Sequence, residues 1–94
     1  MIIVSGHIVT KPGARDAFIE RSREAILAAR KTDGCRDFVV AADPIDPNRV
    51  CIYEVWDDTA KLLAFRGSGP GDDLSTLIES ADVKRHEVAS TGPA

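Results

Sequence analysis

The chain has 94 residues, enough for one domain but too few for a second hydrophobic core, which excludes two-domain enzyme architectures. Hydrophobic residues make up 44% of it and charged residues 29%, a balance typical of globular proteins. The net charge of −3 lacks the basic surplus that phosphate recognition needs, so we expect no nucleic-acid partner. No apolar run approaches the roughly 20 residues that cross a bilayer, so we expect no membrane partner either.

The first third of the chain predicts a strand followed by a helix. Residues 2–10 are rich in β-branched side chains and end at Lys11-Pro12-Gly13, which indicates a strand. Residues 14–31 repeat apolar side chains at three- and four-residue spacing, which predicts a helix that ends at Gly34. The face that this spacing buries is Phe18, Ser22, Ala25, Ile26 and Ala29.

A hairpin follows, with strands over residues 35–42 and 49–57 and a turn over 43–48 that contains two prolines. In the second strand, alternation separates one side (Val50, Ile52, Glu54, Trp56) from the other (Cys51, Tyr53, Val55). Both sides are largely apolar. Since a solvent-facing sheet shows a polar side, we expect both faces of this sheet to be covered.

The last third predicts a helix, a break and a strand. Asp57, Asp58 and Thr59 offer N-cap chemistry for a helix over 60–66, and the glycine-rich run 67–71 breaks it. That run lacks the lysine of a phosphate-binding loop, so we interpret it as a lid over a pocket mouth. A helical pattern resumes over 74–80, and residues 83–89 form the closing strand.

The element order is βαββαβ, the α+β ferredoxin-like plan of a four-stranded antiparallel sheet with two helices on one face. We expect a single domain over residues 1–94, with a core of about 2–88 and a short tail over 89–94. The helices cover only one face, and five aromatic residues make a thin core. We therefore expect a homodimer through the open sheet face, forming a dimeric α+β barrel.

Cysteine use and the N-terminal residues favour the cytoplasm. The start, Met1-Ile2-Ile3-Val4, has neither a basic region nor a small-residue cleavage site. Cys35 and Cys51 are expected to be buried small hydrophobes rather than a disulfide. No Cys/His spacing suggests a metal site, so no metal is expected.

These segments resemble the antibiotic biosynthesis monooxygenase (ABM) family over residues 2–88. The pieces that carry the resemblance are Lys11-Pro12-Gly13, Phe18, Gly34-Cys35 with Phe38, the Asp43-Pro44 and Asp46-Pro47 turn, and Glu54-Val55-Trp56. The resemblance implies a dimeric α+β barrel that oxygenates a quinol or another hydroxylated aromatic ring without a cofactor. In such chemistry the substrate anion reduces O₂, so the protein binds the ring, favours the anion and excludes water.

One departure from the family pattern bears on activity. Family members commonly carry a histidine in the second helix and another in the stretch after it. Here Phe65 stands at the first place, and residues 67–73 replace the second with a glycine-rich run. The role of these histidines has then moved, is not needed by the substrate, or has been lost.

Candidate site residues follow from the strand faces. We expect a substrate pocket between the sheet and the helices, lined by Gly6, Ile8, Ile52, Trp56 and Phe65. The alternative for Trp56 is that it is simply the largest side chain of the core. Gly6 in mid-strand leaves room for a ligand or a neighbouring chain.

Three further residues are candidate proton acceptors: Glu54, His7 and His86. Glu54 shares the pocket face, where its alternative role is an ion pair with an arginine across the dimer. Alternation places His7 on the dimer-facing side, which favours an interface hydrogen bond, and Tyr53 there is expected to anchor the interface. His86 is open between surface and site.

Two hypotheses remain from different functional classes. One is a cofactor-independent monooxygenase that oxidises a quinol or other hydroxylated aromatic with O₂. The other is a non-catalytic dimeric protein that binds an apolar or aromatic small molecule, which the missing histidines favour. Haem degradation is a third reading with less support, since it needs an axial histidine in the second helix.

Overall fold

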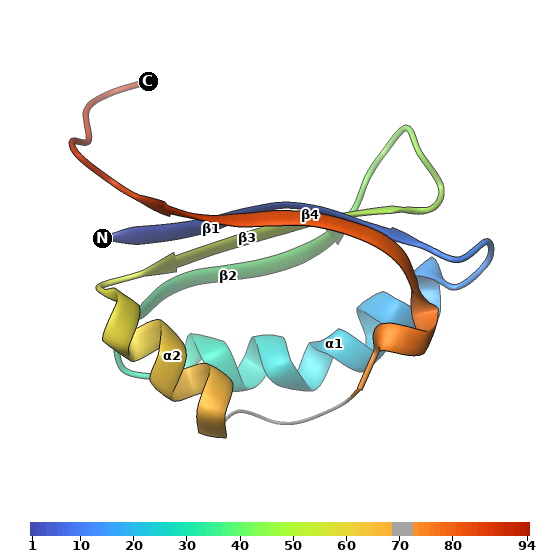
Figure 1. Ribbon diagram of the computed structural model, residues 1–94, viewed down its shortest axis with the longest axis horizontal. Helices are drawn as coiled ribbons and strands as arrows, with labels where there is room; N and C mark the ends of the chain where they lie inside the picture. The colour runs from blue at the N-terminus through green and yellow to red at the C-terminus, as the bar shows by residue number, and fades with distance from the viewer. Residues whose placement is uncertain (69–72) are drawn as a thin grey trace.

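The computed structural model describes residues 1–68 and 73–94 and has the predicted βαββαβ order (Figure 1). Its elements are β1 (Ile2–Thr10), α1 (Arg15–Arg30), β2 (Cys35–Ala42), β3 (Arg49–Trp56), α2 (Thr59–Ser68), the short 3₁₀ turn η1 (Ser75–Leu77) and β4 (Ile78–Glu87). The strands form one antiparallel sheet in the order β2-β3-β1-β4. Both helices lie on one side of it, which confirms the ferredoxin-like α+β fold.

The first three strands and α1 closely match the sequence prediction. β1 and β2 have the predicted bounds, and β3 ends one residue early, at Trp56. α1 is one residue shorter at each end than expected, and its buried residues, Phe18, Ser22 and Ala29, belong to the predicted face. Gly34, with a φ of 89°, then turns the chain into β2, and its carbonyl accepts a hydrogen bond from the Asp57 N–H at the end of β3.

The prediction for the last strand was wrong at its start. Residues 74–80 were expected to be helical, but only the three residues of η1 are, and β4 begins at Ile78 and ends at Glu87 instead of spanning 83–89. Pairing with β1 explains the difference, because β4 follows β1 along its whole length, with one irregularity near Val9 and Thr10. Nearly all of its side chains are exposed, so no apolar alternation marks this edge strand in the sequence.

α2 is longer than predicted. Asp58 caps its start, since the Asp58 carboxylate accepts a 2.8 Å hydrogen bond from the Lys61 N–H. The helix was expected to stop at Arg66, but it continues through Gly67 to Ser68. The rest of the predicted glycine-rich lid, residues 69–71, lies outside the described residues.

The two faces of the sheet follow from the strand register. The side that faces the helices carries Ile2, Val4, Phe38 and Trp56, which pack with Ala29 of α1 and Leu62 of α2 into the core. The opposite side, here called the open face, has no helix over it (Figure 1). By alternation the centre of the open face carries mainly small and apolar side chains: Ile3, Ser5, His7, Val9, Val39, Ala41, Cys51, Tyr53 and Val55. Charged or titratable side chains lie toward its edges: Asp37, Arg49, Asp82, Lys84 and His86.

Candidate functional site

The site is centred on two side chains of β3 that face the helices. Glu54 and Trp56 are two residues apart, so the pleat of the strand turns both to the same side. Trp56 is completely buried and Glu54 is 8% exposed. The indole Nε1 of Trp56 donates a 3.0 Å hydrogen bond to Oε1 of Glu54. The bond satisfies the buried N–H and gives the buried carboxylate one partner.

The environment of Glu54 makes its carboxyl group unusually basic. Burial raises the pKa of Glu54 above its ordinary value, because the charged form loses contact with water. The hydrogen bond from Trp56 and the positive charge of Arg66 act in the opposite direction, but burial outweighs both. A carboxyl group with a raised pKa is a stronger base than an ordinary glutamate and is suited to take a proton from a bound molecule.

Three aromatic rings form one wall of the site. The ring of Phe65 in α2 lies 5.4 Å from that of Trp56 in a tilted arrangement and 6.0 Å from that of Phe38 in an edge-to-face arrangement (centroid distances). Phe38 of β2 pairs in register with Glu54. Phe65 is only partly buried, so it is the ring of the three that reaches the surface of the core.

The other predicted pocket residues lie further along the sheet from Trp56. Gly6 pairs with Ile52 on one side and with Val83 on the other, and Ile8 pairs with Val50. A side chain at Gly6 would overlap the backbone of Asp82 and Val83, so the space it leaves is filled by β4 of the same chain. Ile52 and Ile8 are half-buried and extend the helix-facing side beyond Glu54.

Neither histidine joins Glu54 and Trp56. His7 pairs with Cys51 and Asp82, and His86 pairs with Ile3, all of which lie on the open face. His7 is half-buried there, as alternation predicts, and His86 is exposed. The sheet separates both rings from the Glu54 carboxylate within one chain.

Two arginines near the site were not singled out in the sequence. Arg66 in the last turn of α2 acts electrostatically on Glu54 from within the chain. Arg85 of β4 pairs with Val4, which in turn pairs with Glu54, so the three residues form one row across the helix-facing side. The signal that could have found Arg85 is its two-residue spacing from Val83, the partly buried apolar residue of β4 that packs against the core.

A cavity of about 220 Å³ lies at the other end of the sheet and is lined by Gly13, Arg15, Asp16 and Pro47. Three of its lining residues come directly after the C-terminal end of β1 in the sequence, whereas Trp56 pairs with Ile2 at the N-terminal end of that strand. It is therefore separate from the site around Glu54.

Residues 1–68 and 73–94 contain neither a cluster of metal-binding side chains nor a membrane-spanning helix. No group of three or more His, Cys, Asp or Glu side chains in this part of the chain is placed to hold a metal ion. Both cysteines of the chain are free and half-buried. Of the helices in the described segments, none has the length and apolar character to span a membrane.

Comparison with known proteins agrees with this architecture. The family model for antibiotic biosynthesis monooxygenases (ABM) matches residues 1–71. The uncharacterised protein sll1783 of Synechocystis is 33% identical over 96% of the chain, and the match spans 65% of that relative's length.

Solved structures share the fold. A Deinococcus radiodurans protein, assigned provisionally as an antibiotic biosynthesis monooxygenase, superposes with a TM-score of 0.86 at 21% identity, covering 100% of this chain and 98% of its own. Rv0793 from Mycobacterium tuberculosis has a TM-score of 0.76 at 18% identity, with 98% of each chain covered. The family model covers most of the chain, and the chain therefore belongs to the antibiotic biosynthesis monooxygenase (ABM) family.

Proposed function

We propose that the protein is a cofactor-independent monooxygenase that oxidises a quinol or other hydroxylated aromatic with O₂, and that Glu54 is its proton acceptor. Family membership supports the reaction class. The observation that carries the assignment to Glu54 is its buried carboxylate, whose pKa is raised by burial and which is held by the Trp56 N–H at 3.0 Å. Of the candidate acceptors, Glu54 is the one on the same face as the aromatic rings.

The proposed chemistry needs a base and a dry surface. Glu54 takes a proton from an acidic C–H or O–H of the ring system and leaves a carbanion-like enolate. The enolate transfers electrons to O₂ and forms a C–O bond, and Glu54 returns its proton to the resulting peroxide anion to give C–OOH. Glu54 then removes the second C–H proton while the O–O bond breaks, and this proton goes to the departing hydroxide to give water. For a ring CH₂ group the balance is R₂CH₂ + O₂ → R₂C=O + H₂O. No external reductant is required.

The neighbouring residues then have separate tasks. Trp56 fixes the Glu54 carboxylate through its N–H. Phe65, which is partly exposed, supplies the ring wall that a flat substrate contacts, and Ile8 and Ile52 continue this apolar surface. In this proposal Trp56 acts as a positioning residue, since it is completely buried.

A homodimer through the open face is part of the proposal. Tyr53 is 42% exposed there; Val39 of β2 pairs with it, and Ile3 of β1 is its diagonal neighbour on the same face. Covering this apolar surface with a second copy would close the sheet pair into an α+β barrel and place His7 in the interface.

Oxygen uptake tests the reaction. An oxygen electrode should record turnover with at least one member of a panel of quinols, naphthols and anthrones. The Glu54→Gln variant keeps a hydrogen-bond acceptor for Trp56 but cannot take up a proton, so its kcat should fall about 10²- to 10⁴-fold with little change in KM. Glu20→Gln, on the exposed side of α1, is the matched control and should be fully active.

The alternative is a dimeric protein that binds an apolar or aromatic molecule without turnover. It is favoured by Phe65, which stands where the family pattern described in the sequence analysis has a histidine. Saturable quenching of the fluorescence of Trp56, the single tryptophan, with no oxygen uptake across the panel would overturn the enzyme in favour of this binding role. Haem degradation has less support, since both histidines lie on the open face. A haem titration without a shift of the Soret band would dispose of it.

A further inference from the structure

The loop between β2 and β3, residues 43–48, extends beyond the sheet on the side away from both helices (Figure 1). Ile45 in this loop is 90% exposed, the highest value among the exposed large hydrophobic side chains of the described residues. A single exposed isoleucine is ordinary on a protein surface. Its setting, however, is unusual, because the loop that carries it is firmly held.

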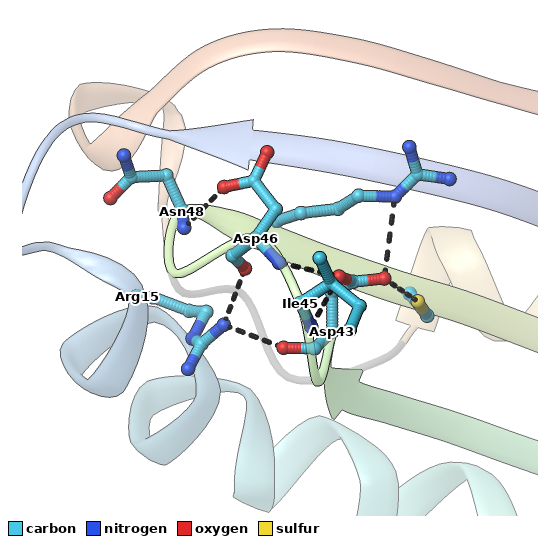
Figure 2. A network of polar contacts seen from close by, with 7 residues as sticks. Arg15, Asp43, Ile45, Asp46 and Asn48 are labelled. Atoms are coloured by element: carbon cyan, nitrogen blue, oxygen red, sulfur yellow. Dashed lines mark hydrogen bonds and ion pairs between the residues drawn. The ribbon is translucent and has the colours of Figure 1, made fainter.

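Asp43 organises the loop from within (Figure 2). Its Oδ2 accepts hydrogen bonds from the backbone N–H groups of Ile45 and Asp46, at 3.0 and 2.8 Å. Asp46 repeats the motif, since its Oδ1 accepts the N–H of Asn48 at 2.9 Å. These bonds fix the backbone on both sides of Ile45.

Neighbouring elements hold the loop from outside. The Arg15 guanidinium, at the start of α1, donates to the carbonyl oxygens of Asp43 and Asp46, at 3.0 and 2.8 Å (Figure 2). At the end of β1, the Thr10 N–H donates to the Asn48 carbonyl at 2.8 Å, and the Thr10 hydroxyl donates to it at 3.2 Å. The loop therefore presents Ile45 to water in a fixed position, and burying it would cost little ordering entropy.

The loop is continuous with the open face. The Asp43 carboxylate, which accepts the Ile45 N–H, also accepts a 3.9 Å hydrogen bond from the thiol of Cys51. Cys51 lies on the open face. Among the exposed large hydrophobic side chains of the described residues, Tyr53 lies on the open face and Ile45 belongs to the loop that extends beyond it, whereas Leu27 and Leu63 lie on the helices. An occupant of the open face would meet Ile45 at its edge.

We infer that Ile45 is an anchor for a second copy of this chain, with the rigid 43–48 loop reaching past the open face to contact the partner. The inference rests on the homodimer of the proposed function and adds a specific contact to it. In a two-fold symmetric dimer the contact occurs twice, so one substitution removes two anchors. The commitment to a second copy follows from the continuity of the loop with the apolar open face.

Sedimentation equilibrium of the full chain tests the anchor. Ile45→Asp should raise the dimer dissociation constant about a hundredfold, because it places two charges in the interface. Ile45→Ala should raise it about tenfold. Leu63→Asp, an equally drastic change at an exposed position of α2, should leave it unchanged. Because Ile45 is exposed in the single chain, both Ile45 variants should show the wild-type circular dichroism spectrum at concentrations where every protein is monomeric.

The outcomes separate the anchor from the dimer on which it rests. A wild-type chain that sediments as a monomer at all concentrations would overturn the dimer and the anchor together, and oxygen uptake would still test the reaction independently. A wild-type dimer whose dissociation constant is unchanged by Ile45→Asp would overturn the anchor alone and leave the loop free for a different partner.

Discussion

Trp56 and Glu54 are joined by a 3.0 Å hydrogen bond between side chains of the same strand, so the one tryptophan of the chain holds a buried carboxylate. Burial of this carboxylate has a cost that depends on pH. The protonated form tolerates the site, whereas the ionised form loses hydration that one N–H only partly replaces. Both stability and activity should therefore respond to the ionisation of Glu54.

The first prediction concerns stability. The pKa of Glu54 is raised in the folded protein, so the native state binds more protons than the unfolded state between about 4.3, the value for a free glutamate, and the raised pKa. The stability that protonated Glu54 contributes is fully present below about pH 4.3 and is lost as pH rises through the raised pKa. Glu54→Gln stays neutral and does not lose stability in this way, so the difference between its urea midpoint and that of the wild type should increase from pH 4 to pH 7. A constant difference across this range would contradict the prediction.

The second prediction uses Arg66 to move the same ionisation. The positive charge of Arg66 lowers the pKa of Glu54, so Arg66→Gln should raise that pKa further. If the ionised carboxylate is the base, kcat/KM for oxygen uptake rises with pH through this pKa, and its midpoint should shift to higher pH in Arg66→Gln. Arg23→Gln, on the exposed surface of α1, should leave the profile in place. An unshifted midpoint in Arg66→Gln would count against Glu54 as the base.

The sequence predicted β1, β2 and β3 well and the edge strand β4 poorly. Apolar and β-branched residues between turn signals gave the bounds of β1, β2 and β3 to within one residue, and alternation along β3 placed Glu54 and Trp56 on the same face. β4 has almost no buried side chains, and only its pairing with β1 determines where it starts. His86 was likewise left open between surface and site, whereas the register places it opposite Ile3 on the open face.

The missing parts of the site depend on packing between elements. Phe38 was not among the predicted pocket residues, but it contacts Phe65 edge to face because α2 brings Phe65 against β2. The effect of Arg66 on Glu54 likewise requires the position of α2, which was predicted to end at this residue and in fact continues past it. Alternation within one strand carries no information about such contacts.

The third prediction concerns the Asp43 loop. The N–H groups of Asp46 and Ile45 and the nearby Arg49 lower the pKa of Asp43. A lowered pKa gives stability that is present above the unfolded value of about 3.9 and is lost as pH falls through the folded value. Asp43→Asn should therefore lower Tm at pH 7, and the deficit should shrink near pH 2.5. Glu20→Gln is the control, and a deficit that grows on acidification would contradict this assignment.

The fourth prediction tests the open face at its centre. Tyr53 is flanked by Ser5 of β1 and Val39 of β2, so Tyr53→Lys places a cation in the middle of the proposed interface. The dimer dissociation constant should rise at least about tenfold in sedimentation experiments. Leu27→Lys, which alters an equally exposed residue of α1, is the control. Equal effects of the two variants would indicate a different interface.

The fifth prediction separates two glycines by the space around them. A methyl group at Gly6, where φ is 151°, would overlap the Asp82 carbonyl in β4, so Gly6→Ala should cost about 3 kcal/mol and disrupt the pairing of β1 with β4. Gly67 lies in the last turn of α2 with nothing near the added atom, so Gly67→Ala should gain about 0.5 kcal/mol. Urea unfolding measures both. Because β4 supplies the Arg85 row beside Glu54, Gly6→Ala should also reduce oxygen uptake, whereas Gly67→Ala should preserve it. A stable Gly6→Ala variant would mean that β4 can move away from β1 at this point without loss of the sheet.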